Sequence, residues 1–280
     1  VIISNSSKRI TINISSIFTD SSAFKLNKAS STLNPGDTIH LEIFFDPLIK
    51  GINYVDTLNI ISNDPDNPSI FIPLIGNEPI TDSIIDIRDN QIYKIVKIGQ
   101  QWWMQENLNI GVRINSSTED IDNGVIEKYC YLDDLDYCKV YGGLYRWDEM
   151  MDYTYPENGT TGINQGICPV GWHLLNDPEW TELINHLGGL VIAERKLKET
   201  GTEHWLEPNT GASNESGFSA LPGGWLEGAS YTNLRWAALF WSSYDDPWGT
   251  IGWNLSVIIQ EVVRESHAKG TGASARCLKD

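Results

Sequence analysis

Cys168, His173 and Glu179 lie close together in the stretch CPVGWHLLNDPEWTEL, residues 168–183. These are the residue types of a nucleophile, a general base and an acid that orients the base. They also suit one end of a disulfide, a packed imidazole ring and a charge in the first turn of a helix. The choice between these roles decides whether the chain is an enzyme or a protein that holds other molecules.

The residues that follow His173 predict a helix. Asp177 stands where a helix N-cap is expected, Pro178 at the first helical position and Glu179 in the first turn. The next apolar residues have helical spacing and would form one buried face: Trp180, Leu183, Ile184 and Leu187. Gly188 and Gly189 are expected to end the helix.

This helix gives the three residues structural roles. Glu179 is a favourable charge near the helix N-terminus, and His173 is interpreted as a packed, hydrogen-bonded ring. No serine or second acid stands at a motif spacing from Cys168 that would identify a nucleophile. We therefore predict no catalytic residue.

The four cysteines fit disulfides better than a metal site. None forms a C-x-x-C motif, and the closest pair, Cys130 and Cys138, is too far apart for a zinc knuckle. An even number in an acidic sequence rich in Asn, Thr and Ser is typical of an exported, oxidised protein. We predict that Cys130–Cys138 closes a local loop and that Cys168–Cys277 ties the middle of its domain to the end. Reduced thiols of a cytosolic protein are the alternative.

Charge and length exclude several classes of function. The chain has 280 residues and a net charge of −17, with a sequence pI of about 4.6. Such a surface repels nucleic acid and anionic lipid, whereas cations, neutral polymers and basic partners remain open. No apolar run reaches the roughly 18–20 residues that would cross a bilayer. Because the sequence begins at Val1 without a signal peptide, we expect part of a longer polypeptide.

Composition also predicts two domains. All eleven tryptophans and all four cysteines follow residue 101, so the two parts would have different cores. In residues 1–77, apolar and polar residues alternate over 10–15 and 39–45, between turn sequences such as NPGD and SNDPDNP. This pattern predicts an all-β antiparallel sandwich. We interpret residues 78–83 as a linker and residues 84–280 as the second domain.

The first part resembles a known repeat. Its stretch LNPGDTIHLEIFFDPLIKGINYVDTLNIISNDPDNPSIFIPLIGN is similar to the abnormal-spindle/Hydin-type (choice-of-anchor D) Ig-like repeat. The resemblance implies an Ig-like sandwich over residues 1–77 that lacks its first strand. We therefore expect an unpaired sheet edge near the N-terminus.

The second part resembles the Fibrobacter succinogenes major paralogous domain. The blocks YGGLYRWDEMM, CPVGWHLLNDPEWTELINHLGG, KLKETGTEHW, SGFSALPGGW, FWSS and ARCLKD occur in the family's order over residues 84–280. Leu175-Asn176 departs from the Leu-Pro that the family typically has there. The resemblance implies an exported surface module of Bacteroidetes- and Fibrobacteres-type bacteria, with an α+β fold similar to C-type lectins. In that fold a Cys before the helix pairs with the last Cys, in agreement with Cys168–Cys277.

In lectin-like folds, long loops over the late strands form the ligand face, here residues 221–257. Aromatic rings in this region can stack on sugars, while carboxylates and amides accept hydroxyl protons. The alternative is that several of these rings are core, as expected for Trp241. The candidate ligand-binding residues are Trp225, Tyr244, Asp245, Asp246, Trp248, Trp253 and Asn254.

Calcium is an open question for such a fold. Related lectins use Glu-Pro-Asn and Trp-Asn-Asp motifs; this chain has Glu-Pro-Asn at 207–209 but no Asp after Asn254. Asp133, Asp134 and Asp136 offer the oxygen ligands that calcium prefers, although a charge run of this kind is usually a solvated loop. We predict no metal ligand and no cofactor, with calcium kept as an option.

We therefore expect a non-catalytic module that is secreted or on the outer cell surface. An Ig-like spacer would present a lectin-like head for adhesion to a glycan or a cell-surface protein. Two alternatives come from other classes. One is an enzyme like the formylglycine-generating oxidases, which have a related fold and use a reactive cysteine pair. The other is a structural subunit of a surface assembly, joined through the open sheet edge.

Overall fold

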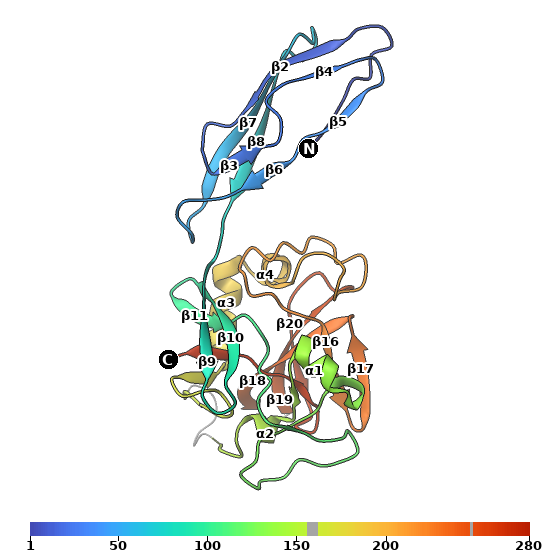
Figure 1. Cartoon of the computed structure of the whole chain (residues 1–280). Helices are drawn as coiled ribbons and strands as arrows, with labels where there is room; N and C mark the ends of the chain where they lie inside the picture. Colours follow the sequence, from blue (N-terminus) through green and yellow to red (C-terminus); the bar gives the residue numbers. More distant parts are fainter. Residues whose placement is uncertain (156–161, 247–248) are drawn as a thin grey trace. The chain divides into compact units, whose positions relative to one another are not determined.

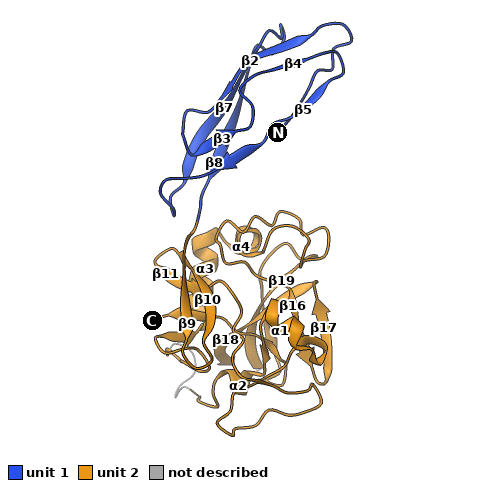
Figure 2. Cartoon of the chain, in the orientation of Figure 1, with its two compact units in different colours: residues 1–78 blue, residues 79–280 orange. Residues whose placement is uncertain are grey.

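The computed structural model describes residues 1–155, 162–246 and 249–280 of the chain. The chain forms two compact units, unit 1 with residues 1–78 and unit 2 with residues 79–280 (Figure 2). Each unit has its own hydrophobic core, as the separate compositions of the two parts predict.

Unit 1 is all-β. Its strands are β1 (Ile2–Ser4), β2 (Ile12–Phe18), β3 (Phe24–Leu26), β4 (Ser31–Leu33), β5 (Thr38–His40), β6 (Ile43–Phe45), β7 (Tyr54–Ser62) and β8 (Ser69–Gly76). An antiparallel sheet has the order β4-β2-β7-β8, while β1 pairs with β5 and β3 pairs with β6 (Figure 1). The alternating residues bury one face, and the core contains Ile14, Ile17, Leu33, Leu41, Leu58 and Ile60.

Two details of the alternating stretches differ from the expectation. Ile10 is 52% exposed and precedes the strand, which begins at Ile12. The stretch 39–45 is divided between β5 and β6, because its first half pairs with β1 and its second half with β3. Leu41 lies between them and is buried, so the alternation reflects one continuous inner face rather than one continuous strand.

The edges of unit 1 are of two kinds. Among the described strands β1 has only β5 as a partner, so its other edge is unpaired, as expected near the N-terminus. The longest edge strand, β8, carries Pro73 opposite Thr57 of β7. Proline has no N–H to offer a further strand, so it interrupts the ladder that an added strand would form along β8.

The described part of unit 2 contains two larger sheets and four short α-helices (Figure 1). The first sheet has the order β15-β22-β11-β10-β9, and the second has the order β14-β21-β18-β16-β17, with β19 and β20 continuing beyond β18. The first sheet consists of β9 (Ile80–Asp86), β10 (Gln91–Ile98), β11 (Gln101–Met104), β15 (Trp172–Leu174) and β22 (Cys277–Lys279). The second consists of β14 (Leu144–Tyr145), β16 (Gly223–Glu227), β17 (Ser230–Leu234), β18 (Ala237–Asp246), β19 (Gly249–Ser256), β20 (Val263–His267) and β21 (Ala273–Ser274).

The remaining elements of unit 2 connect and cover these sheets. They are the short pair β12 (Val112–Arg113) and β13 (Glu127–Lys128), the 3-10 turn Tyr131–Asp133, and the helices α1 (Leu135–Tyr141), α2 (Trp147–Met150), α3 (Asp177–Leu187) and α4 (Leu190–Leu197). In the described part of the chain, no helix has both the length and the apolar character needed to span a membrane.

The predicted linker at 78–83 is wrong for most of its length. Residues 80–86 form β9, which pairs with β10 from Ile80↔Lys97 to Asp86↔Gln91. Thr81, Asp82 and Ser83 are all exposed, so both faces of this edge strand are in water over these residues. A polar edge strand therefore has the composition of a linker.

Helix α3 has the predicted buried face, but it begins one residue earlier than predicted. The N-cap is Asn176, not Asp177. Asn176 Oδ1 accepts from the Glu179 N–H at 2.9 Å, and Glu179 Oε2 accepts from the Asn176 N–H at 2.9 Å, which is a capping box. Asp177 instead pairs with Arg264 at 2.8 Å. Gly188 ends the helix with φ of 108°, a left-handed conformation that costs glycine little.

Both predicted disulfides are present. Cys130–Cys138 joins the start of the 3-10 turn to α1, and Cys168–Cys277 joins the chain before β15 to the last strand. β22 lies between β15 and β11 in the first sheet, so the last residues of the chain are central to unit 2. The second disulfide fixes this late strand to a segment 109 residues earlier.

Candidate functional site

The group Cys168, His173 and Glu179 has structural roles. Cys168 is bonded to Cys277, and the His173 ring, 3% exposed, lies between two carboxylates. His173 Nδ1 is 2.7 Å from Asp280 Oδ1 and Nε2 is 2.9 Å from Glu179 Oε1. Burial opposes the imidazolium, but the two carboxylates outweigh it and raise the pKa of His173. The ring therefore ties α3 to the C-terminus.

The predicted aromatic ligand residues do not form one exposed platform. Trp253 is 3% exposed and stacks on Trp180 at 5.9 Å between ring centroids, so its predicted role as an exposed sugar-stacking ring is wrong. Trp225 in β16 is half-buried, with its ring edge-on to His267. Tyr244 is half-buried beneath the Arg264 guanidinium at 5.9 Å.

The predicted polar ligand residues of the late strands already have protein partners. Asp245 Oδ2 is 2.9 Å from Lys269 Nζ, and Asn254 Nδ2 donates to Glu265 Oε1 at 2.9 Å. Trp248 and the side chain of Asp246 lie outside the described residues. The late strands thus supply core and internal ion pairs at the positions that the structure describes.

The acidic residues considered for calcium are used inside the fold. Asp133 accepts from Ser116 and from the Tyr231 hydroxyl at 2.7 Å, Asp134 caps α1, and Asp136 pairs with Lys139. Within residues 1–155, 162–246 and 249–280, no three His, Cys, Asp or Glu side chains converge as metal ligands.

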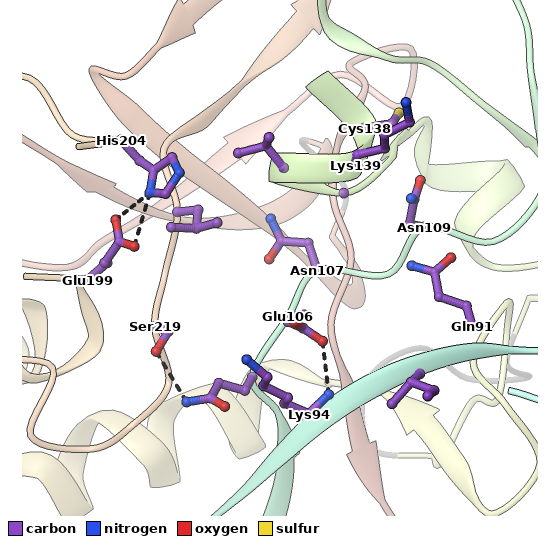
Figure 3. A pocket seen from close by; sticks show the side chains of 15 residues that line it. Gln91, Lys94, Glu106, Asn107, Asn109, Cys138, Lys139, Glu199, His204 and Ser219 are labelled. Atoms are coloured by element: carbon purple, nitrogen blue, oxygen red, sulfur yellow. Dashed lines mark hydrogen bonds and ion pairs between the residues drawn. The ribbon is translucent and has the colours of Figure 1, made fainter. Parts of the chain in front are cut away.

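A polar pocket of about 550 Å³ with described walls lies in unit 2 (Figure 3). Four separate parts of the unit form it: the start of β10, the segment after β11, helix α1, and the segment between α4 and β16. Its lining is Gln91, Ile92, Lys94, Gln105, Glu106, Asn107, Asn109, Cys138, Lys139, Val140, Gly142, Glu199, His204, Ser219 and Leu221.

Asn107 forms the centre of this polar pocket. In Figure 3 it lies between Gln91 and Asn109 on one side and Glu199 and His204 on the other. Its Nδ2 donates to the Tyr141 carbonyl at 2.7 Å and to Ser274 Oγ at 3.1 Å, so its side chain is fixed. Gly142, with φ of 80°, allows this packing because a Cβ there would lie 2.5 Å from the Asn107 Cβ.

Several polar groups of the pocket have no protein hydrogen-bond partner among the described residues. They are the Gln91 side-chain amide, Lys94 Nζ, Gln105 Oε1, Asn109 Nδ2 and His204 Nε2. Three of these side chains are held by their other polar atoms: Gln105 Nε2 donates to Ser219 Oγ at 3.3 Å, Asn109 Oδ1 accepts from Lys128 Nζ at 2.8 Å, and His204 Nδ1 hydrogen-bonds to Glu199. The pocket therefore presents donors and acceptors to the cavity, of which those of Gln105, Asn109 and His204 are held in place.

On the opposite wall, His204 and Glu199 form a pair. His204 Nδ1 is 2.9 Å from Glu199 Oε2, and the imidazole stands edge-on to Tyr141 at 5.7 Å. Because Nδ1 bonds to the carboxylate, Nε2 is the ring nitrogen that remains for a ligand in the cavity.

The sequence interpretation missed this pocket. Its residues come from separate segments and have no motif spacing, so only the fold brings them together. The one local signal is the run Gln105–Asn109, QENLN, in which polar residues directly follow a buried strand. A polar run next to two buried tryptophan-rich cores could have been recognised as the floor of a site.

Comparison with known proteins agrees with the second resemblance. The sequence model of the Fibrobacter succinogenes major domain matches residues 96–279, about two thirds of the chain. Neither the curated proteins nor the solved structures contain a match. The matched region includes α1, α3 and both disulfides, and most of the lining of the polar pocket. The chain belongs to the Fibrobacter succinogenes major domain family.

Proposed function

We propose that the chain is an exported, non-catalytic binding module whose polar pocket holds a hydroxyl-rich ligand, a glycan. The observation that carries the proposal is the set of unpartnered amide, ammonium and imidazole groups that face the pocket. A sugar presents hydroxyls that both donate and accept, and these groups could pair with them in several directions. The site differs from the late-strand platform first expected.

Two further observations support export and binding. Disulfides persist in oxidising compartments, and unit 2 has two of them. The proposed lectin-like character of unit 2 rests on the order of its elements, with an early helix, late strands and a disulfide from before the helix to the last strand. Unit 1 would then be an Ig-like spacer for this head.

The oxidase alternative requires a reduced, reactive cysteine pair. All four cysteines are in disulfides, so neither Cys168 nor Cys130 offers a thiolate in this state of the protein. The surface-assembly alternative relied on strand addition at the open edge near the N-terminus, and β1 does have an unpaired edge among the described strands. Pro73 works against strand addition only along β8, and no partner chain on β1 favours the alternative over the polar pocket. Binding at the polar pocket is the function that we retain.

A glycan array and polysaccharide pull-downs with the full chain test the proposal. Gln91→Leu removes an amide that lines the pocket while keeping side-chain size, and we expect it to weaken binding about tenfold. Gln100→Leu is the matched control, because Gln100 is exposed in the turn between β10 and β11 and does not line the pocket. Absence of binding to every glycan by a folded chain, or equal binding by both variants, would refute the proposal.

A further inference from the structure

We propose that the polar pocket selects sugars that carry a carboxylate, so that its ligands are uronic-acid residues of an acidic glycan. This inference rests on the proposed function and specifies the class of sugar. It comes from a buried guanidinium behind the pocket, that of Arg276, which hydrogen-bonds to no carboxylate in the described part of the chain.

Arg276 is 2% exposed, and its hydrogen bonds go to neutral groups. Nε donates to Asn107 Oδ1 at 2.8 Å, and the other nitrogens donate to the carbonyls of Met104, Phe218 and Ser219. The guanidinium also stacks on the Phe218 ring at 4.0 Å. Burial lowers the pKa of Arg276 to about 9, so the group is still a cation at neutral pH. The Glu106 carboxylate acts on this cation through space and raises its pKa, but less than burial lowers it. A buried cation without a direct ion pair is unusual, because desolvation is normally offset by one.

The guanidinium of Arg276 lies directly behind the wall of the polar pocket. Asn107 and Ser219 both accept from Arg276 and both line the pocket, so two of its contacts are shared with the cavity wall. In Figure 3, Asn107 occupies the centre of the pocket. Glu106, which also lines the pocket, offsets this charge only in part, so an anion placed against Asn107 would add to the counter-charge.

The positive and negative charges of the other lining residues nearly cancel. Lys94 has no ion-pair partner among the described residues, whereas Lys139 pairs with Asp136 at 2.6 Å. Glu199 is engaged by His204, and Glu106 Oε2 accepts the Lys94 N–H at 2.9 Å. Adding the Arg276 cation makes the site neutral to positive, in a chain whose net charge is −17.

This contrast gives a prediction with a definite sign. If the overall field of the protein governs binding, added salt screens repulsion and strengthens the binding of an acidic sugar. If the local cations govern it, added salt weakens binding. We expect weakening, by about threefold to tenfold between low and high ionic strength, because Lys94 is exposed to screening.

The experiment is a calorimetric titration of the full chain with short oligosaccharides of galacturonate, glucuronate and mannuronate, each compared with its carboxyl-reduced neutral form. We expect at least one acidic oligosaccharide to bind about tenfold more tightly than its reduced form. Equal affinity of every pair, or binding that strengthens with salt, overturns this inference and leaves the proposed function intact. If no acidic, reduced or other neutral glycan binds the folded chain, the proposed function itself fails.

Three variants locate the effect. Lys94→Gln is expected to lose most of the preference for the acidic form, while Lys97→Gln, the same change on the same strand but outside the pocket, keeps it. Arg276→Gln removes the buried charge and is expected to weaken the preference for the acidic form while keeping the salt dependence that Lys94 supplies, with tryptophan fluorescence as the check on folding. If Arg276→Gln does not fold, the sign of the salt effect and the Lys94–Lys97 comparison still decide. Equal losses in Lys94→Gln and Lys97→Gln would contradict the assignment.

Discussion

The two disulfides of unit 2 are expected to contribute very different free energies of unfolding. They close loops of different length, since Cys168 and Cys277 are 109 residues apart and Cys130 and Cys138 are 8 apart. The chain-entropy relation gives about 4.8 kcal/mol for the long loop and about 2.6 kcal/mol for the short one. All four sulfur atoms are buried, so the packing lost on replacing each pair by alanine is similar and largely cancels in the comparison.

Urea unfolding of the full chain measures this difference. All eleven tryptophans follow residue 101, so tryptophan fluorescence reports on unit 2 even with unit 1 attached. We expect the Cys168→Ala/Cys277→Ala variant to be less stable than the Cys130→Ala/Cys138→Ala variant by about 2 kcal/mol. Equal stabilities, or a larger loss for the local pair, would refute the view that β22 is held by the long cross-link.

Three further predictions concern buried polar groups. Lys198→Met should lower the free energy of unfolding in urea by about 3–5 kcal/mol. The reason is that the Lys198 ammonium, 2.7 Å from Glu194, is the counter-charge of a carboxylate that is 1% exposed. The double variant Glu194→Gln/Lys198→Met should recover much of this loss. Burial raises the pKa of Glu149 from its usual 4.5 to about 7, so the free energy of unfolding should fall as pH rises between these values, and Glu149→Gln should flatten this slope. Asn176→Ala, which removes the cap of α3, should cost about 1 kcal/mol in the same assay, and no loss would contradict the capping box.

Much of the scaffold could be predicted because its signals are local. The buried face of α3 follows from helical spacing, and its end from Gly188. The Cys168–Cys277 pairing could also be predicted, partly through the family resemblance. The N-cap was misplaced by one residue because both Asn176 and Asp177 are good capping residues, and only the reciprocal bonds with Glu179 distinguish them.

The binding residues were harder to predict because tryptophan occurs both in hydrophobic cores and on ligand-binding surfaces. A glycine-flanked Trp253 is a plausible surface ring in sequence, yet it stacks on Trp180 in the core. The polar pocket could not be predicted because Gln91, Asn107 and His204 are brought together by tertiary structure alone. The buried charge of Arg276 is equally hidden, since ARCLKD places acidic and basic residues side by side without showing which are buried.

The central claim is that the polar pocket of unit 2 binds a glycan and leaves it unchanged. Backbone NMR spectra of the labelled full chain, recorded during titration with the best ligand of the array, test it most directly. The account predicts that shift changes concentrate at Gln91, Gln105, Asn107 and Asn109, and that the glycan is recovered with its mass unaltered. Shift changes confined to the late strands around Asp245, or a cleaved or oxidised ligand, would contradict it.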